Sequence, residues 1–375
     1  MTTGAAQIAA IHTGLLHGGL DLSPTGVPRT PLIVVELDDL AVAGRATIAR
    51  AAALLRESLP LTVGLLRRPL TAAVEPLLDA LTMTLGDVRV RTGTPEDCLS
   101  REVVPVLDVD AALQQLRAAV AHAPQAALAC EHLLRRTSTV DTTSALAAEA
   151  AVYSMLLGGS EFARWSNERD ATRRARTPER GPLRPGRSDP GDDLVRMRRE
   201  ASTLTIMLNH PSRRNALSVR LREELLAALA VAESDSGIDA VEFTGAGPAF
   251  CSGGDLAEFG AATDPVAAYL VRLDRAPWRV LDRISGRLTA RVHGACIGAG
   301  AEMAAFAGEV VAAPDTWFRF PEVAMGLIPG AGGTVSVPRR IGRWRAAWLM
   351  MSGARLSAPE ALRWGLVDQV TGTPG

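Results

Sequence analysis

A single glutamate, Glu302, stands in a stretch of small apolar residues, GACIGAGAEMAAFAG at positions 294–308. Water would reach a carboxylate poorly there, and poor solvation raises the pKa of a carboxyl group toward the range that suits proton transfer. A second glutamate, Glu322, follows a proline in FPEV. Taken alone, Glu302 also fits a partner for the dipole of a helix start, and Glu322 fits a cap at a strand end. Their chemistry therefore depends on what surrounds them.

Two glycine-rich loops could place backbone N–H groups beside these carboxylates. The first, FTGAGPAFCSGGDLAEF at 243–259, follows a strand and presents the bare N–H of Gly254. The second, ARVHGACIGAGAEMAAF at 290–306, leads into a helix that begins near residue 299. Two N–H groups that converge on one carbonyl oxygen would form an oxyanion hole for the enolate of a thioester. Glycine loops taken singly are more typical of tight turns.

The elements that must position these loops alternate along the chain. Residues 201–210 and 238–247 have the composition of strands, and 217–234 form an amphipathic helix between them. Strand, helix and strand in this order predict parallel pairing with crossover helices, the α/β arrangement in which ligands bind at the carboxyl ends of strands. Both glycine-rich loops follow such strand ends.

The first half of the chain has a different pattern. Short aliphatic runs at 30–40 and 59–70 predict buried strands, whereas 44–58, 109–136 and 144–165 carry alanine and leucine at helical spacing. Plausible helix N-caps are Asp108 or Asp110 and Asp141 or Thr143. After them comes a segment rich in Arg, Pro and Asp, which predicts an exposed linker. We expect three parts: a domain at 1–165, a linker at 166–195 and a core at 196–375.

Composition argues against several classes of protein. The 375 residues include 40 basic and 41 acidic ones, so the net charge of −1 gives no general attraction to nucleic acid or to an anionic membrane. Four cysteines without paired spacing and six histidines without close spacing argue against a disulfide scaffold and a metal site. The sequence shows no secretory leader or membrane span and predicts a cytoplasmic protein.

Five ordered motifs resemble the enoyl-CoA hydratase/isomerase (crotonase) family. They are LNHPSRRNALS, GAGPAFCSGGDL, HGACIGAGAEMA, FPEVAMGLIPGAGGT and SGARLSAPEALRWGLVDQV, and they cover roughly residues 200–370. The resemblance implies an α/β fold of the crotonase-like type, a spiral of ββα units. It also implies an acyl-CoA enzyme whose coenzyme A is part of the substrate, with no separate cofactor, working as a trimer or hexamer of identical subunits.

The resemblance also assigns roles to residues of this chain. It implies that the N–H groups of Gly254 and Ala299 form the oxyanion hole, and that Glu302 and Glu322 share the general acid/base work of adding water to a 2-enoyl-CoA. The family commonly has glycine where this chain has Ala299. The coenzyme A would lie along four residues, largely through their backbone groups: Arg214, Ala216, Ser252 and Leu256.

The chain departs from the family's pattern in its order of parts. Family members usually continue beyond the last motif into helices that pack on a neighbouring subunit, whereas this sequence stops at Gly375. Residues 101–165 resemble that helical tail, and 30–95 would then be a shortened copy of the family's core without an oxyanion-hole motif. We expect a duplicated chain whose first, mainly helical unit is catalytically dead and supplies structure to the second.

Several other functions are compatible with the same motifs. Related enzymes hold a similar enolate and then isomerise a double bond or hydrolyse the thioester. The long N-terminal extension is also similar to that of a cofactor-independent dioxygenase acting on dihydroxyphenylacetyl-CoA, although Glu302 and Glu322 count against this reaction. A non-catalytic acyl-CoA-binding subunit is the remaining alternative. Possession of both glutamates favours hydration.

Overall fold

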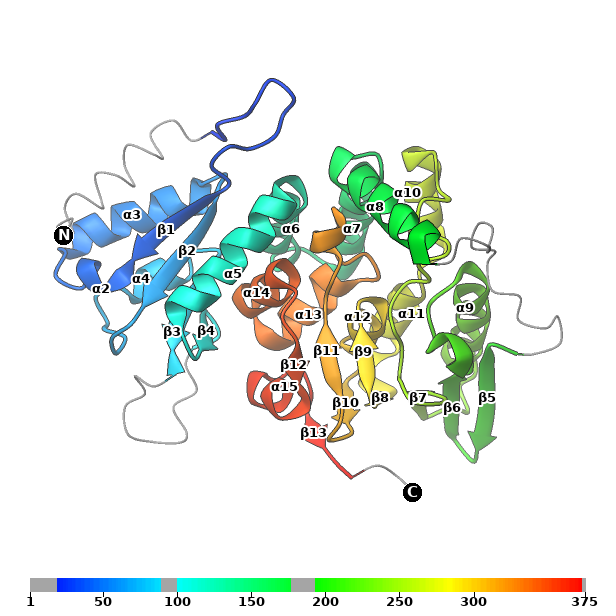
Figure 1. The fold of residues 1–375 in the computed structure, drawn as a ribbon. Coiled ribbons are helices and arrows are strands. Elements are labelled where there is room, and N and C mark those ends of the chain that lie inside the picture. Colours follow the sequence, from blue (N-terminus) through cyan, green and yellow to red (C-terminus); the bar gives the residue numbers. More distant parts are fainter. Residues whose placement is uncertain (1–18, 89–99, 177–192, 373–375) are drawn as a thin grey trace.

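The computed structural model describes residues 19–88, 100–176 and 193–372. Two sheets lie at opposite sides of the molecule, with a layer of helices between them (Figure 1). None of the helices in these three ranges is long and apolar enough to cross a membrane.

The N-terminal sheet has four parallel strands paired in the order of the sequence. All six residues of the second strand are buried, because helices cover both faces of the sheet. The predicted strands at 30–40 and 59–70 are confirmed, whereas the third and fourth strands were not predicted. The strands are β1 (Leu32–Glu36), β2 (Leu61–Leu66), β3 (Met83–Asp87) and β4 (Val103–Val106), with the helices α2 (Leu37–Leu40), α3 (Arg45–Glu57) and α4 (Glu75–Leu78).

Four helices follow this sheet: α5 (Val109–His122), α6 (Pro124–Thr137), α7 (Thr142–Leu157) and α8 (Ser160–Arg176). Asp108 caps α5 by accepting two backbone N–H groups, and Asp141 caps α7. The helices predicted at 109–136 and 144–165 are therefore confirmed, whereas residues 101–165, expected to be a helical tail, begin with the strand β4. The linker predicted at 166–195 begins inside α8, and residues 177–192 lie outside the described residues.

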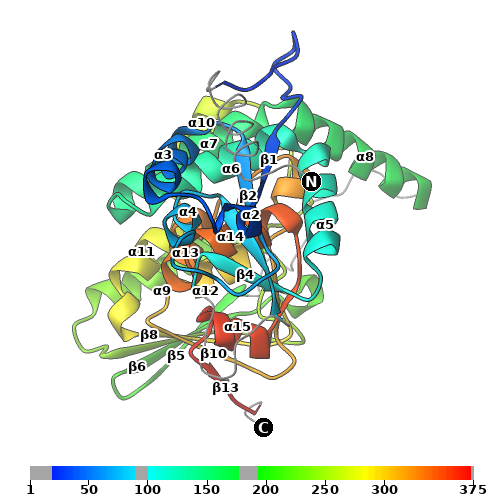
Figure 2. The ribbon, with the colours of Figure 1, turned by 90° about the vertical axis from the view of Figure 1, so that its left-hand side faces the viewer.

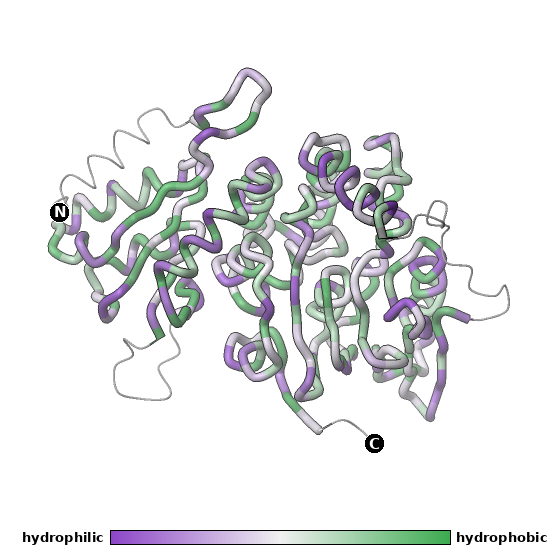
Figure 3. The backbone as a smooth tube through the Cα atoms, in the orientation of Figure 1, coloured by the Kyte–Doolittle hydropathy of each residue, from purple (hydrophilic) through white to green (hydrophobic). Residues whose placement is uncertain are grey.

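The C-terminal sheet has six strands in the order β13-β10-β8-β7-β6-β5. All its pairings are parallel except that of the edge strand β5 with β6. Five of the six residues of β5, VRMRRE, are exposed, and Figure 3 shows this edge as hydrophilic. The strands are β5 (Val195–Glu200), β6 (Thr203–Leu208), β7 (Ala240–Gly245), β8 (Leu288–Val292), β10 (Glu309–Ala312) and β13 (Gln369–Val370).

A smaller sheet turns this strand order into a spiral. Its strands are β9 (Ala295–Ile297), β11 (Trp317–Arg319) and β12 (Leu356–Ser357), with β9 and β11 parallel. The chain therefore repeats one unit: a strand in the large sheet, a strand in the small sheet, then a helix. The fold is the predicted α/β spiral of ββα units. Its helices and short 3-10 turns are η2 (Pro211–Arg213), α9 (Val219–Ser234), α10 (Pro265–Asp274), α11 (Pro277–Arg283), η3 (Ser285–Arg287), α12 (Ala299–Ala304), η4 (Val323–Met325), α13 (Gly333–Ile341), α14 (Arg343–Ser352) and α15 (Ala358–Trp364).

One hydrophobic core joins the two regions. It runs from the inner face of β2–β4 through α5–α7 into the C-terminal unit, where α5 and α6 contact α14 while α6 and α7 contact α13. Arg343 of α14 donates to the carbonyl oxygens of Leu81 and Asp79 beside the N-terminal sheet. Figure 2 looks onto this contact from the N-terminal side. The helices of the first predicted unit and the core of the second therefore pack as one body.

Candidate active site

Three chain segments run parallel to one another and end at the same cavity. Cys251 pairs in parallel with Cys296 of β9, and Cys296 pairs in parallel with Phe318 of β11. Their continuations carry three of the predicted site residues, Gly254, Ala299 and Glu322, because each lies three or four residues beyond its paired position. These residues and Glu302 line a cavity of about 650 Å³. The parallel pairing therefore brings together residues that are far apart in the sequence.

The two predicted oxyanion-hole amides follow glycines with left-handed backbone conformation. Gly253 has a φ of 92° and Gly298 a φ of 47°, angles that side chains rarely allow. The two glycines are neighbours, since a Cβ atom on Gly298 would lie 3.7 Å from the Cα of Gly253. In the described ranges, neither following N–H donates to a backbone oxygen outside a helix, and Ala299, as the first residue of α12, has no acceptor within its helix. Both amides are therefore available to an oxygen in the cavity.

Glu302 is buried and bonds to the residues that lead into α13, not to its own helix. Its Oε2 accepts the N–H groups of Ala331 at 2.6 Å and Gly333 at 2.9 Å. Burial raises the pKa of Glu302 well above its usual range, and the nearby charges of Glu322 and Glu149 raise it further. These hydrogen bonds are not the ones expected if Glu302 were only a partner for the dipole at the start of α12.

Glu322 lies just before η4, and its carboxyl group is next to Gly298. Its side chain makes no capping hydrogen bond to η4. A Cβ atom on Gly298 would lie only 2.2 Å from Glu322 Oε1, so the glycine leaves room for the carboxyl group. The Oε2 atom is buried and has no hydrogen-bond partner among the described residues. Burial raises the pKa of Glu322 to about 8.

The four residues predicted to hold coenzyme A lie beside the cavity and do not line it. Arg214 and Ser252 are joined by a backbone hydrogen bond, and Ala216 precedes the lining residue Leu217. Leu256 is 45% exposed, and its carbonyl oxygen accepts a hydrogen bond from Arg169 of α8. These positions therefore form a rim next to the oxyanion-hole amides.

The segment after Gly254 has no regular helix or strand. Residues 256–260 form turns. Asp255 is buried, accepts the N–H of Ala257 and pairs with Arg213 at 2.6 Å. Arg213 therefore has a carboxylate partner within the protein.

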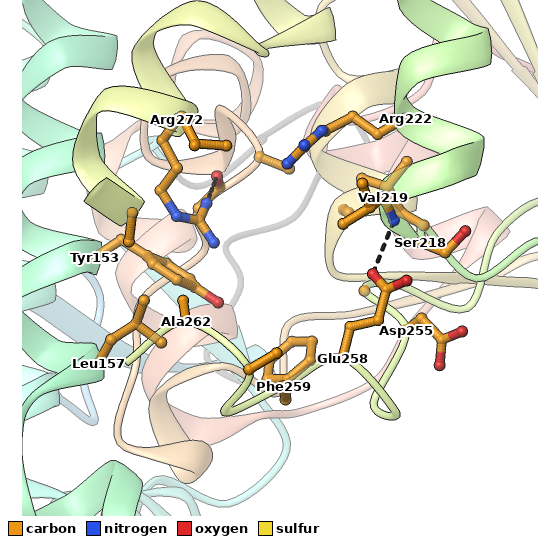
Figure 4. Close-up of a pocket in the computed structure, with 18 of the residues that line it drawn as sticks. Tyr153, Leu157, Ser218, Val219, Arg222, Asp255, Glu258, Phe259, Ala262 and Arg272 are labelled. Carbon is orange, nitrogen blue, oxygen red and sulfur yellow. Dashed lines mark hydrogen bonds between the residues drawn. The ribbon is translucent and has the colours of Figure 1, made fainter. Parts of the chain in front are cut away.

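Several residues near the cavity were not predicted. Tyr153 of α7 and Arg272 of α10 lie on one side of it, opposite Arg222 (Figure 4). The Arg272 guanidinium carbon is 3.4 Å from the centre of the Tyr153 ring, and its Nη1 donates to the carbonyl oxygen of Gly330 at 2.8 Å. One turn before Tyr153, the buried Glu149 bonds to the same loop as Glu302.

A local signal existed for Glu149. It stands alone in ALAAEAAV, as Glu302 stands alone in GAGAEMAAF, and a lone carboxylate among alanines predicts a poorly solvated group in both places. No comparable pattern surrounds Tyr153 or Arg272, because their proximity depends on the packing of α7 against α10.

Comparison with known proteins identifies the C-terminal part. The family model for enoyl-CoA hydratase/isomerase matches residues 198–373. The 2,3-dehydroadipyl-CoA hydratase of Escherichia coli (strain K12) is 36% identical over 172 residues, which are 46% of this chain and 67% of that protein. The mitochondrial enoyl-CoA hydratase of Pongo abelii is 34% identical over 167 residues, 44% of this chain and 56% of that protein. The chain thus spans between about half and two thirds of these relatives.

A solved structure of enoyl-CoA hydratase from Bacillus anthracis is 31% identical, with a TM-score of 0.45 over 48% of this chain and 70% of that one. The motifs, the spiral of ββα units and the identity to curated relatives agree. This chain belongs to the enoyl-CoA hydratase/isomerase family.

Proposed function

We propose that the protein adds water reversibly to a 2-enoyl-CoA and forms a 3-hydroxyacyl-CoA. The observation that carries this proposal is the pair of buried carboxyl groups, Glu302 and Glu322, in the same cavity as the N–H groups of Gly254 and Ala299. Hydration needs three things: stabilisation of negative charge on the thioester oxygen, a base for water and an acid for the α-carbon.

In this proposal the thioester carbonyl lies between the N–H groups of Gly254 and Ala299. Water attacks the β-carbon, and electron density moves through the double bond to the thioester oxygen, where the two N–H groups stabilise it. The rim residues predicted for coenzyme A adjoin Gly254, which suits a thioester at this end of the cavity. The methyl group of Ala299 leaves the backbone N–H in place.

The two glutamates share one proton in the active form. One carboxylate takes a proton from the attacking water and the other carboxyl group delivers a proton to the α-carbon, so that water is added with no net change in protonation of the pair. The buried, unbonded Oε2 of Glu322 suits a hydrogen bond with the water. Burial raises both pKa values, which favours keeping a proton on the pair.

The acyl group is the part of the substrate that the family does not define. The name of the Escherichia coli relative specifies an acyl chain that ends in a carboxylate. Arg272, which lines the same cavity as Glu302, would suit such a group. A substrate panel should therefore include a carboxylated 2-enoyl-CoA beside crotonyl-CoA and longer unbranched chains.

The test is a steady-state assay that follows loss of the conjugated thioester absorbance. With an accepted enoyl-CoA, we expect Glu302→Gln and Glu322→Gln each to lower kcat by about 10³-fold, since each removes a proton-transfer group. Glu161→Gln is the matched control, because Glu161 is also buried and accepts two backbone N–H groups but lies outside the cavity. Turnover that survives in both variants would contradict the proposal, and a product that keeps its double bond would indicate isomerisation instead.

A further inference from the structure

Two buried glutamates share the loop at 331–334, which consists of the two residues before α13 and the first two residues of that helix. Its N–H groups point alternately to opposite sides: those of Ala331 and Gly333 bind Glu302, whereas those of Gly332 and Thr334 bind Glu149. The distances to Glu149 are 2.7 Å and 3.0 Å, and the Thr334 hydroxyl adds a third bond at 2.6 Å. Four successive N–H groups of one loop therefore hold two carboxyl groups from different parts of the chain.

Further contacts attach this loop to the N-terminal helices. Thr137 of α6 donates its hydroxyl hydrogen to the carbonyl oxygen of Thr334 at 2.7 Å. On the other side of the loop there is no free space, because a Cβ atom on Gly333 would lie 2.5 Å from Glu302 Cγ. A movement of the loop away from Glu149 would thus change the position of Glu302.

We infer that Glu149 is a positioning residue for the reaction: from helix α7 it holds the loop at 331–334 in the conformation that presents two N–H groups to Glu302. This inference rests on the proposed hydration. A misplacement of a catalytic group by about 1 Å can lower a rate by about 10²-fold, so Glu149 contributes to the rate from outside the lining of the cavity.

The charge of Glu149 also acts on the catalytic pair. Burial raises its pKa to about 7, against the opposing effect of its hydrogen bonds to Thr334 and Gly332. The titratable and charged groups that interact with it come from several elements: Cys130 of α6, Arg272 of α10, Glu302 of α12 and Glu322 before η4. An ionised Glu149 raises the pKa values of Glu302 and Glu322, because like charges repel.

The first experiment compares Glu149→Gln with the wild type and with the control Glu161→Gln. We expect Glu149→Gln to lower kcat by roughly 10- to 100-fold with little change in KM. It should also move the acidic limb of the pH–rate profile to lower pH by about one unit, because removal of a negative charge lowers the pKa of the pair. Glu161→Gln should change neither quantity.

A second pair of variants tests the same bond from the loop side. Thr334→Val loses the hydroxyl that donates to Glu149, whereas Thr334→Ser keeps it. We expect Thr334→Val to lower kcat and Thr334→Ser to restore it, even if Glu149→Gln folds poorly. Equal kcat in the two threonine variants, together with an unshifted profile in Glu149→Gln, would overturn the inference.

An infrared titration separates this inference from the proposed function. The absorbance of protonated buried carboxyl groups is followed against pH in the wild type, Glu149→Gln and Glu161→Gln, without substrate. If the midpoint pH of the remaining carboxyl groups is lower in Glu149→Gln than in the wild type and in Glu161→Gln, the coupling is supported even if no enoyl-CoA is turned over. An unchanged midpoint in an enzyme that does hydrate enoyl-CoA would refute the coupling and leave the hydration intact.

Discussion

The four-stranded sheet β1–β4 and the parallel part of the C-terminal sheet share one plan, in which parallel strands succeed one another in sequence order. They differ at the carboxyl ends of their strands. Beyond β7 and β8 the chain forms glycine loops that carry Gly254 and Ala299 to the cavity. Beyond β1 and β2, ion pairs join Arg67 to Glu36 at 2.5 Å and to Asp110 at 2.6 Å.

This difference shows that a parallel sheet positions the groups that follow its strands but does not itself provide catalytic groups. Asp38 accepts the N–H groups of Arg67 and Arg68, so charged side chains and backbone groups at this end of β2 satisfy one another. In the C-terminal unit, by contrast, the amides after Gly253 and Gly298 face the cavity and two buried carboxyl groups lie beside them. Activity belongs to the loops at strand ends and not to the fold as such.

The sharpest test of the comparison exchanges one glycine in each region for alanine. Gly298→Ala should lower kcat by about 10²-fold, because the new Cβ atom would lie 2.2 Å from Glu322 Oε1 and the φ of 47° disfavours a side chain. Gly64→Ala in β2 meets Leu81 Cδ1 at 2.7 Å and should cost about 1–3 kcal/mol of stability with kcat unchanged. Steady-state kinetics and urea unfolding of both variants measure the contrast, and an equal fall in kcat would break it.

Buried glutamates of the two regions should respond to replacement with opposite signs. Folding raises the pKa of Glu322 from 4.5 to about 8, so the folded state favours the protonated carboxyl group. The protein therefore keeps its full stability below pH 4.5 and loses part of it as the pH rises through about 8, because the buried group must then ionise. Glu322→Gln removes this cost and should stabilise the protein at alkaline pH by on the order of 4 kcal/mol.

The partner variant is Glu131→Gln near the N-terminal sheet. Glu131 is buried and paired with Arg135 and Thr82, and breaking such a pair should destabilise the protein by about 3 kcal/mol. Thermal unfolding of both variants against pH gives the two signs. Destabilisation of Glu322→Gln at alkaline pH would show that its carboxylate is satisfied in the folded state.

The smallest effect is expected at the ion pairs of the N-terminal sheet. Arg67→Met should lower the free energy of unfolding by about 0.5 kcal/mol, because these ion pairs are accessible to water. The side chain of Arg67 is 37% exposed, and those of Glu36 and Asp110 are 35% and 74% exposed. The kcat of the variant should equal that of the wild type. A measurable loss of turnover would mean that the ion pairs at this end of the sheet affect the geometry of the cavity.

Much of the catalytic unit could be predicted from the sequence because its signals are local. Glycines with left-handed φ at 253 and 298, alternating strands and Asp caps on α5 and α7 each depend on a few neighbouring residues. The short strands β3 and β4 were missed, since Met83–Asp87 and Val103–Val106 carry little periodicity and depend on pairing across the sheet. The predicted domain division, the duplicated origin and the oligomeric state remain predictions.

The sequence by itself determined the family, the spiral fold and the four residues proposed for catalysis, because their motifs are compact and ordered along the chain. Only the tertiary structure decided that Glu149, 153 positions before Glu302 in the sequence, bonds to the same loop. The physical reason is that hydrogen bonds between distant segments arise from packing, here of α6 and α7 on α13, and leave no periodic trace in either segment.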